Sequence, residues 1–238
     1  MKYYPVEALI IKALDYGESH RIFTLFSKEQ GKFAAIARGV KKPKSALKGH
    51  LQLGNRCDFL LYHGRGLDTI SQAVAKDSYP HIRENPRSYL YASYFMELLN
   101  ISLPEREAEA EIFSLACQVF QALAYISPPT LARYFELRLL AALGYDSDFK
   151  HCAACGGELK EGFLSPRFPG VICEKCGSGY PVSPQALYAL NYYRGNDLET
   201  LERLKISSET ARQASNATKH LLTYNLEKKI KSRDILGE

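Results

Sequence analysis

The N-terminal stretch "VEALIIKALDYGESHRIFTLFSKEQGKFAAIARGV", residues 6–40, contains three short apolar runs separated by turn residues. The runs cover residues 6–14, 20–27 and 32–40. Short runs rich in β-branched and aromatic residues, bounded by Gly, Asp and Glu, are typical of strands joined by tight turns. This stretch therefore predicts three successive strands at the front of the chain.

Two more runs of the same kind follow, at residues 56–63 and 68–75. A long loop from Lys41 to Gly54 precedes the first of them, and the turn Gly64-Arg65-Gly66 separates the two. Five closely spaced strands with one long connection indicate a small barrel, and the OB-fold is the commonest five-stranded barrel that binds nucleic acid. An SH3-like barrel would show a similar pattern, so the number of strands does not decide between them.

The hydrophobic period becomes helical after Pro80. Apolar residues recur at helical spacing over 89–99, 112–123 and 131–143, and again over 183–193 and from 207 to about 233. Pro86, Pro104 and Pro128 lie where helix starts are expected, and Gly144 is placed to end a helix. We therefore expect a helical bundle behind the barrel.

Two Cys-x-x-Cys pairs interrupt the helical part, Cys152 with Cys155 and Cys173 with Cys176. Their separation is within the range of a four-thiolate zinc ribbon. Four cysteines fill a tetrahedron and leave no position for water, so we expect one structural zinc ion. Two disulfides, or a site that carries no metal in the cell, are the alternatives. His151 is better explained as a polar neighbour than as a ligand.

The predicted fold is therefore α+β and multidomain, an N-terminal OB-fold β-barrel followed by an α-helical domain with an inserted four-cysteine zinc module. The expected boundaries are 1–80 for the barrel, 81–145 and 183–238 for the two parts of the helical domain, and 146–182 for the zinc module.

Positive charge is concentrated at the front of the chain. Residues 1–60 carry eleven Lys and Arg against five Asp and Glu, whereas the remaining residues carry 20 against 21. The loop sequence "ARGVKKPKSALKGH", residues 37–50, contains five cations and no acid: Arg38, Lys41, Lys42, Lys44 and Lys48. Such a cluster favours contact with a phosphate backbone, and a solvated surface loop is the alternative. Tyr16, Phe23, Phe33 and Tyr62 are candidates for stacking on bases.

Several classes of protein are disfavoured by what the sequence lacks. It contains no GxxxxGK[ST], HExxH or GxSxG pattern, so we expect no enzyme of those kinds. An enzyme whose site is scattered along the sequence, such as a zinc-containing nuclease, stays open, and so does a transcription-associated zinc protein. No apolar run follows Met1 or is long enough to cross a membrane, which predicts a cytoplasmic protein.

Three stretches carry a resemblance to a known family: residues 8–53, "RYFELRLLAALGYDSDFKHCAACG" at 133–156, and "LEKKIKSRDIL" at 226–236. In these stretches, and in its order of barrel, helices and inserted cysteine pairs, the chain resembles the bacterial DNA repair protein RecO family. The resemblance covers essentially the whole chain.

The resemblance implies a recombination mediator that is not an enzyme. Such a protein binds single- and double-stranded DNA, anneals complementary strands, engages the C-terminal tail of the single-strand binding protein SSB, and acts with RecR to load RecA. It implies phosphate contacts for the five loop cations and more weakly for Arg21. The SSB tail would need a groove with a basic rim, for which the last helix offers Lys228, Lys229, Lys231 and Arg233, although these can equally be solvated charges.

Overall fold

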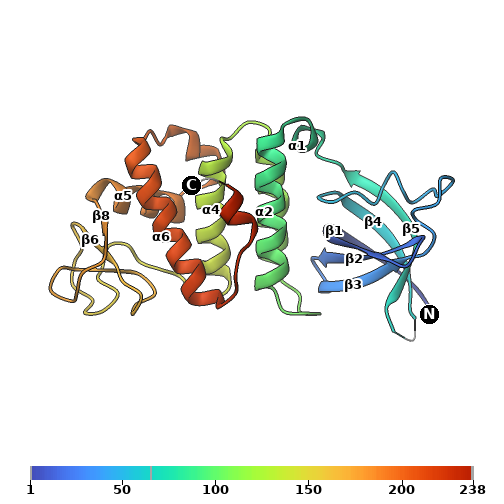
Figure 1. Ribbon diagram of the computed structural model, residues 1–238, viewed down its shortest axis with the longest axis horizontal. Coiled ribbons are helices and arrows are strands. Elements are labelled where there is room, and N and C mark those ends of the chain that lie inside the picture. The colour runs from blue at the N-terminus through green and yellow to red at the C-terminus, as the bar shows by residue number, and fades with distance from the viewer. Residues whose placement is uncertain (1, 65, 237–238) are drawn as a thin grey trace. The chain divides into compact units, whose positions relative to one another are not determined.

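In the computed structural model, residues 2–64 and 66–236 are described (Figure 1). They form two compact units. The first unit ends at Ala124 and the second begins at Tyr125. The first contains the strands of the barrel and the first three helices, whereas the second contains the remaining helices and a small cysteine-rich sheet. The helices that follow the barrel are therefore divided between the two units.

The N-terminal barrel is closed by five strands in the order β1-β2-β3-β5-β4, which is an OB-fold. The strands are β1 (Tyr3–Tyr16), β2 (His20–Ser27), β3 (Gly31–Ala37), β4 (Arg56–Tyr62) and β5 (Asp68–Asp77). This confirms the predicted five-stranded barrel and excludes the SH3-like alternative. The predicted third strand was too long, because Arg38 to Val40 already belong to the loop that follows β3.

The length of β1 is what closes the barrel. Its first half, from Tyr3 to Leu9, pairs with β4, and its second half, from Ala8 to Tyr16, pairs with β2. The register with β2 shifts at a β-bulge between Ile10 and Lys12, and bulges sharpen the bend of a strand. Alternate residues fill the interior, among them Ala8, Ile10, Phe23, Leu25, Phe33, Ala35, Phe59 and Leu61.

Three helices complete the first unit: α1 (Pro80–Glu84), α2 (Pro86–Ser102) and α3 (Ala110–Ala122). The prediction for Pro86 is confirmed, since it opens α2 and the Asn85 side chain accepts hydrogen bonds from two backbone amides of the first turn. The prediction for Pro104 was wrong. The segment after α2 pairs with β3 through Lys32 and Glu105, and Arg106 adopts a left-handed conformation with φ of 62°, so the next helix begins only at Ala110.

The second unit packs α4 (Pro128–Ala142), α5 (Pro184–Gly195) and α6 (Ser208–Leu226) against one another. Two short 3-10 helices, η1 (Leu198–Arg203) and η2 (Ser232–Ile235), complete it. Gly144, with φ of +88°, ends α4 as predicted, because its amide and that of Tyr145 donate to carbonyls of the last helical turn.

The last helix is shorter than predicted. It ends at Leu226, because Glu227 adopts a left-handed conformation with φ of 50°. The charged residues that follow therefore belong to an irregular segment and to η2. No helix in the described part of the chain is both long and apolar enough to cross a membrane.

Candidate nucleic-acid interface and metal centre

The basic loop between β3 and β4 is fixed to the barrel by apolar side chains. Val40 and Leu51, at its two ends, are almost completely buried in the barrel core, and Leu47 packs against the same core from the middle of the loop. Three apolar anchors in so short a segment hold its backbone against the barrel. The intervening polar residues are consequently directed to solvent.

Hydrogen bonds fix the start of this loop to the β1–β2 hairpin. The Gly39 amide donates to Nδ1 of His20 over 2.9 Å, and the Lys41 amide donates to the Ser19 carbonyl over 3.1 Å. Gly39 has φ of +67°, a conformation that residues with a side chain rarely adopt. His20 therefore has a positioning role at the base of the loop that sequence reasoning did not find.

All five predicted loop cations lie on the surface: Arg38, Lys41, Lys42, Lys44 and Lys48 are exposed. Successive turns run through the loop, with amides of Lys42, Ser45 and Lys48 donating to carbonyls three residues before them. Among the described residues, Arg38, Lys42, Lys44 and Lys48 have no ion-pair partner. The loop thus displays uncompensated positive charge on a short, turn-rich scaffold.

Arg21 is linked to the cations of the loop through Asp15, an acid that the sequence did not identify as part of this cluster. Asp15, at the end of β1, accepts from Nε of Arg21 over 2.7 Å and from Nζ of Lys41 over 2.9 Å. Hydrogen bonds from Lys41 and then Arg21 lower the pKa of the Asp15 carboxyl. The hairpin and the loop are therefore brought together around one carboxylate.

The four candidate aromatic residues separate into two pairs. Phe23 and Phe33 are 1% exposed and belong to the barrel core, so they cannot reach a base. Tyr16 is 55% exposed and Tyr62 is half-buried at the end of β4. Burial thus limits base stacking to tyrosines on the outside of the barrel.

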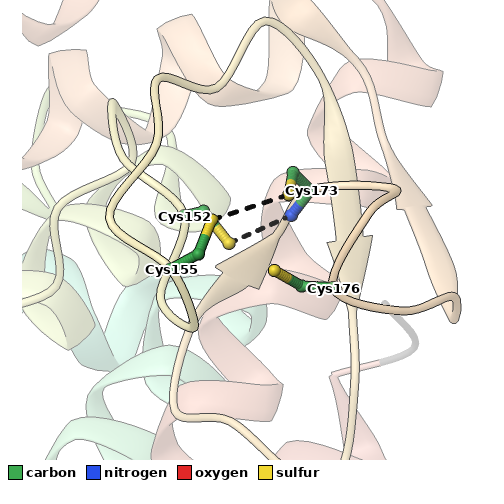
Figure 2. Close-up of side chains that lie close together, drawn as sticks. All are labelled: Cys152, Cys155, Cys173 and Cys176. Carbon is green, nitrogen blue, oxygen red and sulfur yellow. Dashed lines mark hydrogen bonds between the residues drawn. The ribbon is translucent and has the colours of Figure 1, made fainter.

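The four paired cysteines converge at one point of the second unit. Their sulfurs all lie within 4.8 Å of one another, and Sγ of Cys155 is 3.9 Å from Sγ of Cys173 (Figure 2). Around a zinc ion with Zn–S bonds of about 2.3 Å, tetrahedral sulfurs are about 3.8 Å apart. The four sulfurs are therefore spaced to bind one metal ion as thiolates.

Two turns present these sulfurs. The Gly156 amide donates to the Cys152 carbonyl and the Cys176 amide donates to the Cys173 carbonyl, so each pair closes a tight turn. The turns are supported by a three-stranded sheet in the order β7-β6-β8, formed by β6 (Gly162–Leu164), β7 (Val171–Ile172) and β8 (Tyr180–Val182). The cysteines are thus held by a small module rather than by the helices.

Backbone amides already stabilise negative charge on one of the sulfurs. Sγ of Cys152 accepts from the amides of Ala154 and Cys173 over 3.4 and 3.3 Å. Burial raises the pKa of Cys152, but these backbone hydrogen bonds outweigh it and give a pKa of about 6. Contacts with Cys155 and Cys173 raise the pKa of Cys176 to about 12, because without a cation the neighbouring sulfurs do not all ionise.

His151 lies beside the cluster but is not part of it. Its Nδ1 is paired with the Asp148 carboxylate, and within the described part of the chain the group that could hold a metal consists of the four cysteines alone. Hydrogen bonding to His151 lowers the pKa of Asp148. This agrees with the expectation that His151 is a polar neighbour.

The four candidate residues for partner binding have different environments. Lys228, Lys229 and Lys231 are exposed in the segment after α6. Lys228 and Lys229 line an open pocket of about 440 Å³ together with Lys219 and Ile230, and the carboxylates of Glu227 and Asp234 belong to the same lining. Lys228 and Lys229 therefore lie beside a hollow in the surface of the second unit, although neither is on a helix.

Arg233 does not lie on an exposed rim, contrary to expectation. It is 6% exposed and donates to the buried carboxylate of Glu136 on α4. It also donates to the Ser215 carbonyl and to the Thr218 hydroxyl of α6. Arg233 thus fixes the C-terminal segment to two helices, a role that helical periodicity could not reveal.

Two family models and several known proteins match this chain, and together they cover nearly all of it. Residues 1–79 match the family described as "Recombination protein O N terminal", and residues 83–234 match "Recombination protein O C terminal". A relative from Pelotomaculum thermopropionicum, named DNA repair protein RecO, is 35% identical over 98% of this chain and 93% of its own length. Relatives of the same name from Desulfitobacterium hafniense and Dehalococcoides mccartyi are each 32% identical over 98% and 96% of this chain, and over 88% and 93% of their own lengths.

Proposed function

The chain belongs to the recombination protein O family of DNA repair proteins, and from this premise we propose that it is a DNA-annealing recombination mediator. In this proposal it binds single- and double-stranded DNA through the first unit and anneals complementary strands. Together with RecR it would help to load RecA on DNA coated with SSB. Action on chromosomal DNA would place it at the nucleoid, in the cytoplasm.

The observation that supports this proposal most strongly is the basic loop. Five exposed cations lie on a segment that apolar anchors hold rigid against an OB-fold barrel. Neutralised phosphates release counterions, and this release drives binding without reading the sequence. A surface that neutralises backbones without enclosing the bases leaves those bases free to pair. Annealing by this route requires neither nucleotide hydrolysis nor a catalytic residue.

The proposal is tested by reversing the charge of the loop. The triple variant Lys41→Glu/Lys42→Glu/Lys44→Glu should bind an oligonucleotide at least about a hundredfold more weakly, since each lost phosphate contact also becomes a repulsion. The melting temperature should hardly change, because these side chains are exposed. Affinity equal to that of the unaltered protein would contradict the proposal.

A matched control changes the same total charge on the second unit. Lys150→Glu/Lys160→Glu/Lys175→Glu alters three exposed lysines of the cysteine module, and it should leave most of the affinity intact. Equal losses in the two triple variants would mean that net charge alone, and not the loop, governs binding.

The salt dependence of binding gives an independent measure of the number of phosphates contacted. Four to six contacts predict a slope of log K against log salt of about −3 to −4 for a single strand. Affinity should then fall about a hundredfold between 50 and 200 mM salt. A slope near zero would contradict binding to a nucleic-acid backbone.

Annealing distinguishes a mediator from an enzyme. Labelled complementary strands should form a duplex in the presence of the protein without Mg²⁺ or ATP. Fragments that appear only when Mg²⁺ is added would instead support a nuclease, and polymerase binding without annealing would support a transcription-associated protein.

We further propose that the four thiolates hold one structural zinc ion. When bound, zinc would link the two turns and stabilise the folded cysteine module. The binding free energy of zinc at such sites in peptides is about 10 to 16 kcal/mol. Cys152, Cys155, Cys173 and Cys176 would occupy all four positions, which leaves none for water or substrate. Metal analysis of the purified protein should give one zinc per chain, and loss of that zinc in Cys152→Ser would identify the site.

For the SSB tail we propose the pocket beside the segment after α6. Its three lysines, Lys219, Lys228 and Lys229, outnumber the carboxylates of Glu227 and Asp234 and would face the acidic side chains of the tail. Ile230 would contact the apolar end of the tail. The double variant Lys228→Glu/Lys229→Glu should weaken binding of a fluorescent tail peptide without altering DNA binding. Unchanged peptide affinity in this variant would contradict the proposed location.

A further inference from the structure

The turn that carries Cys155 is open to solvent. Every residue from Ala153 to Glu158 is exposed, and Gly156 and Gly157 have no side chain that could cover the sulfur. A Cβ atom added to Gly157 would lie 3.5 Å from Sγ of Cys155, an ordinary contact distance. Small reagents dissolved in water therefore reach the Cys155 sulfur directly from this side.

The sulfur of Cys152, in the same turn, is protected. Cys152 is 3% exposed, and its Sγ accepts from the amides of Ala154 and Cys173 over 3.4 and 3.3 Å. Cys173 and Cys176 have intermediate exposure. Oxidation of cysteine is selective for exposed sulfurs with thiolate character, and all four sulfurs are thiolates when they bind a metal. Cys155 is therefore the first of the four to meet a dissolved oxidant.

A sulfur of the other turn is in contact with that of Cys155. Sγ of Cys155 and Sγ of Cys173 are 3.9 Å apart, although the two residues are 18 positions apart in the sequence (Figure 2). A disulfide bond is about 2 Å long, so the two sulfurs would need to approach each other by about 2 Å. A bond between them would join the same two turns that a metal ion joins.

We propose that the four-cysteine site is an oxidation-sensitive switch, in which a peroxide links Cys155 to Cys173 and thereby releases the metal. The proposal rests on the structural zinc ion proposed above. It adds to that structural role a response to the oxidation state of the surroundings, located in the second unit and away from the basic loop of the first.

The reaction takes two steps. The Cys155 thiolate attacks one oxygen of hydrogen peroxide, the O–O bond breaks, and a sulfenic acid and a hydroxide form. The Cys173 thiolate then attacks the sulfur of the sulfenic acid, the S–S bond forms and a second hydroxide leaves. Two protons from solvent convert both hydroxides to water. The two sulfurs have then lost the two electrons that the peroxide has gained.

Oxidation removes half of the metal ligands but keeps the two turns together. Only Cys152 and Cys176 remain as free thiolates, which is too few to fill a tetrahedron, so the site no longer holds the ion. The new disulfide bond holds the turns close to each other, and its reduction returns four sulfurs to one place. The loss of metal is therefore reversible, unlike oxidation to sulfinic or sulfonic acid.

The two cysteines outside the cluster serve as internal controls. Cys57 is completely buried in the barrel, and burial raises its pKa to about 12. Burial likewise raises the pKa of Cys117. Protonated, buried thiols are unreactive, so both should stay reduced while the cluster is oxidised. The double variant Cys57→Ala/Cys117→Ala should accordingly release zinc at the same rate as the unaltered protein.

The experiment treats the zinc-loaded protein with a small excess of hydrogen peroxide and measures zinc and disulfides in the same sample. A chromogenic chelator should detect about one zinc ion for each disulfide formed. Peptide mapping without reductant should show Cys155 linked to Cys173, and dithiothreitol with added zinc should restore the bound metal. Disulfides confined to the pairs Cys152 with Cys155 and Cys173 with Cys176 would overturn the proposal.

A variant that keeps all four ligands tests the role of exposure. Gly157→Val places a branched side chain against the Cys155 sulfur, so it should slow zinc release by at least about threefold. Its matched control is Gly195→Val, the same change at a position of the second unit where an added Cβ has open space, and it should leave the rate unchanged. Equal rates in the two variants would contradict Cys155 as the first sulfur oxidised.

The outcomes separate this proposal from the one on which it rests. Purified protein without zinc would overturn the structural metal and the switch together. Zinc that stays bound at a peroxide concentration that oxidises free glutathione in the same sample would overturn the switch alone and leave the structural metal standing.

Discussion

Each of the two units contains a carboxylate placed between two cations, and the two triads differ in almost everything else. On the barrel, Asp15 lies between Arg21 and Lys41, and the side chains are 54%, 42% and 35% exposed. In the helical unit, Glu136 lies between Arg133 and Arg233, and none of the three exceeds 5%. The same charges thus occur once in water and once in the interior.

The difference decides what each triad is able to do. A surface ion pair contributes little to stability, so its cations can exchange a carboxylate for another anion at small cost. In the interior, removing one partner leaves a charge that is buried and unpaired. The barrel triad is therefore suited to releasing its cations to a phosphate, and the helical triad is suited to holding Arg233 and the C-terminal segment in place.

Removal of the proposed zinc ion should have the largest effect, and this effect should be confined to the second unit. Chelation, or Cys152→Ser, should unfold the cysteine module, because a structural zinc site in a peptide contributes about 10 to 16 kcal/mol. Proteolysis should then cut between residues 146 and 182 while the barrel stays intact. Loss of DNA binding in parallel with the metal would contradict the assignment of DNA to the first unit.

Breaking the buried triad should have the next largest effect. Glu136→Gln keeps the shape but removes the charge that pairs both arginines, and it should cost about 3 to 5 kcal/mol in denaturant unfolding. Its matched control is Asp15→Asn, the same change of carboxylate to amide in the exposed triad, which should leave the unfolding midpoint unchanged. Equal midpoints for the two variants would remove the distinction between the triads.

A buried acid of the first unit extends the comparison, because the stability that it contributes depends on pH. Asp68, 3% exposed, accepts from the Tyr4 hydroxyl over 2.6 Å, from Arg106 over 3.1 Å, and is paired with His63. Burial alone raises the pKa of Asp68, but hydrogen bonds from Tyr4, Arg106 and His63 outweigh it and lower the pKa. Burial, and then the hydrogen bond to Asp68, raise the pKa of Tyr4 to about 12.

Because folding lowers the pKa of Asp68, the direction in which stability changes with pH can be stated. The ionised form of Asp68 is favoured by folding, so its contribution is complete above the unfolded-state pKa of about 4 and is lost as the pH falls through the lower folded value. Asp68→Asn should cost about 1 to 3 kcal/mol at neutral pH, and the difference from the unaltered protein should diminish below about pH 4. Urea unfolding at pH 7 and pH 3 measures both quantities, and a difference that grows on acidification would contradict this account.

The smallest effect should be that of replacing Asp15 on the affinity for DNA. Asp15→Asn removes a negative charge from the interface and frees Arg21 and Lys41, so the affinity for a single strand should rise about two- to fivefold. If the carboxylate instead serves to position the two cations, affinity should fall. Titration with a labelled oligonucleotide at low salt distinguishes the two results.

Much of the fold followed from local sequence patterns. The five strands, the end of the fourth helix at Gly144 and the helix start at Pro86 were all predicted, because each depends on neighbouring residues along the chain. The same holds for the four cysteines, whose spacing within each pair defines a turn. Local patterns failed at Pro104, where pairing of the next residues with β3 replaced the expected helix, and at Glu227, where a left-handed residue ended α6 early.

The sequence by itself determined the five-stranded barrel, the presence of the main helices though not all of their ends, the four sulfurs that could hold a metal and the loop in which positive charge is concentrated. Tertiary structure alone decided that Asp15 joins the basic cluster, that Arg233 is buried against Glu136, and that Tyr3, Tyr16 and Tyr62 share a groove while Phe23 and Phe33 fill the core. The physical reason is distance along the chain. Turn and period signals arise between near neighbours, whereas an ion pair across 97 residues or the pairing of Tyr3 with Tyr62 exists only after the chain has closed on itself.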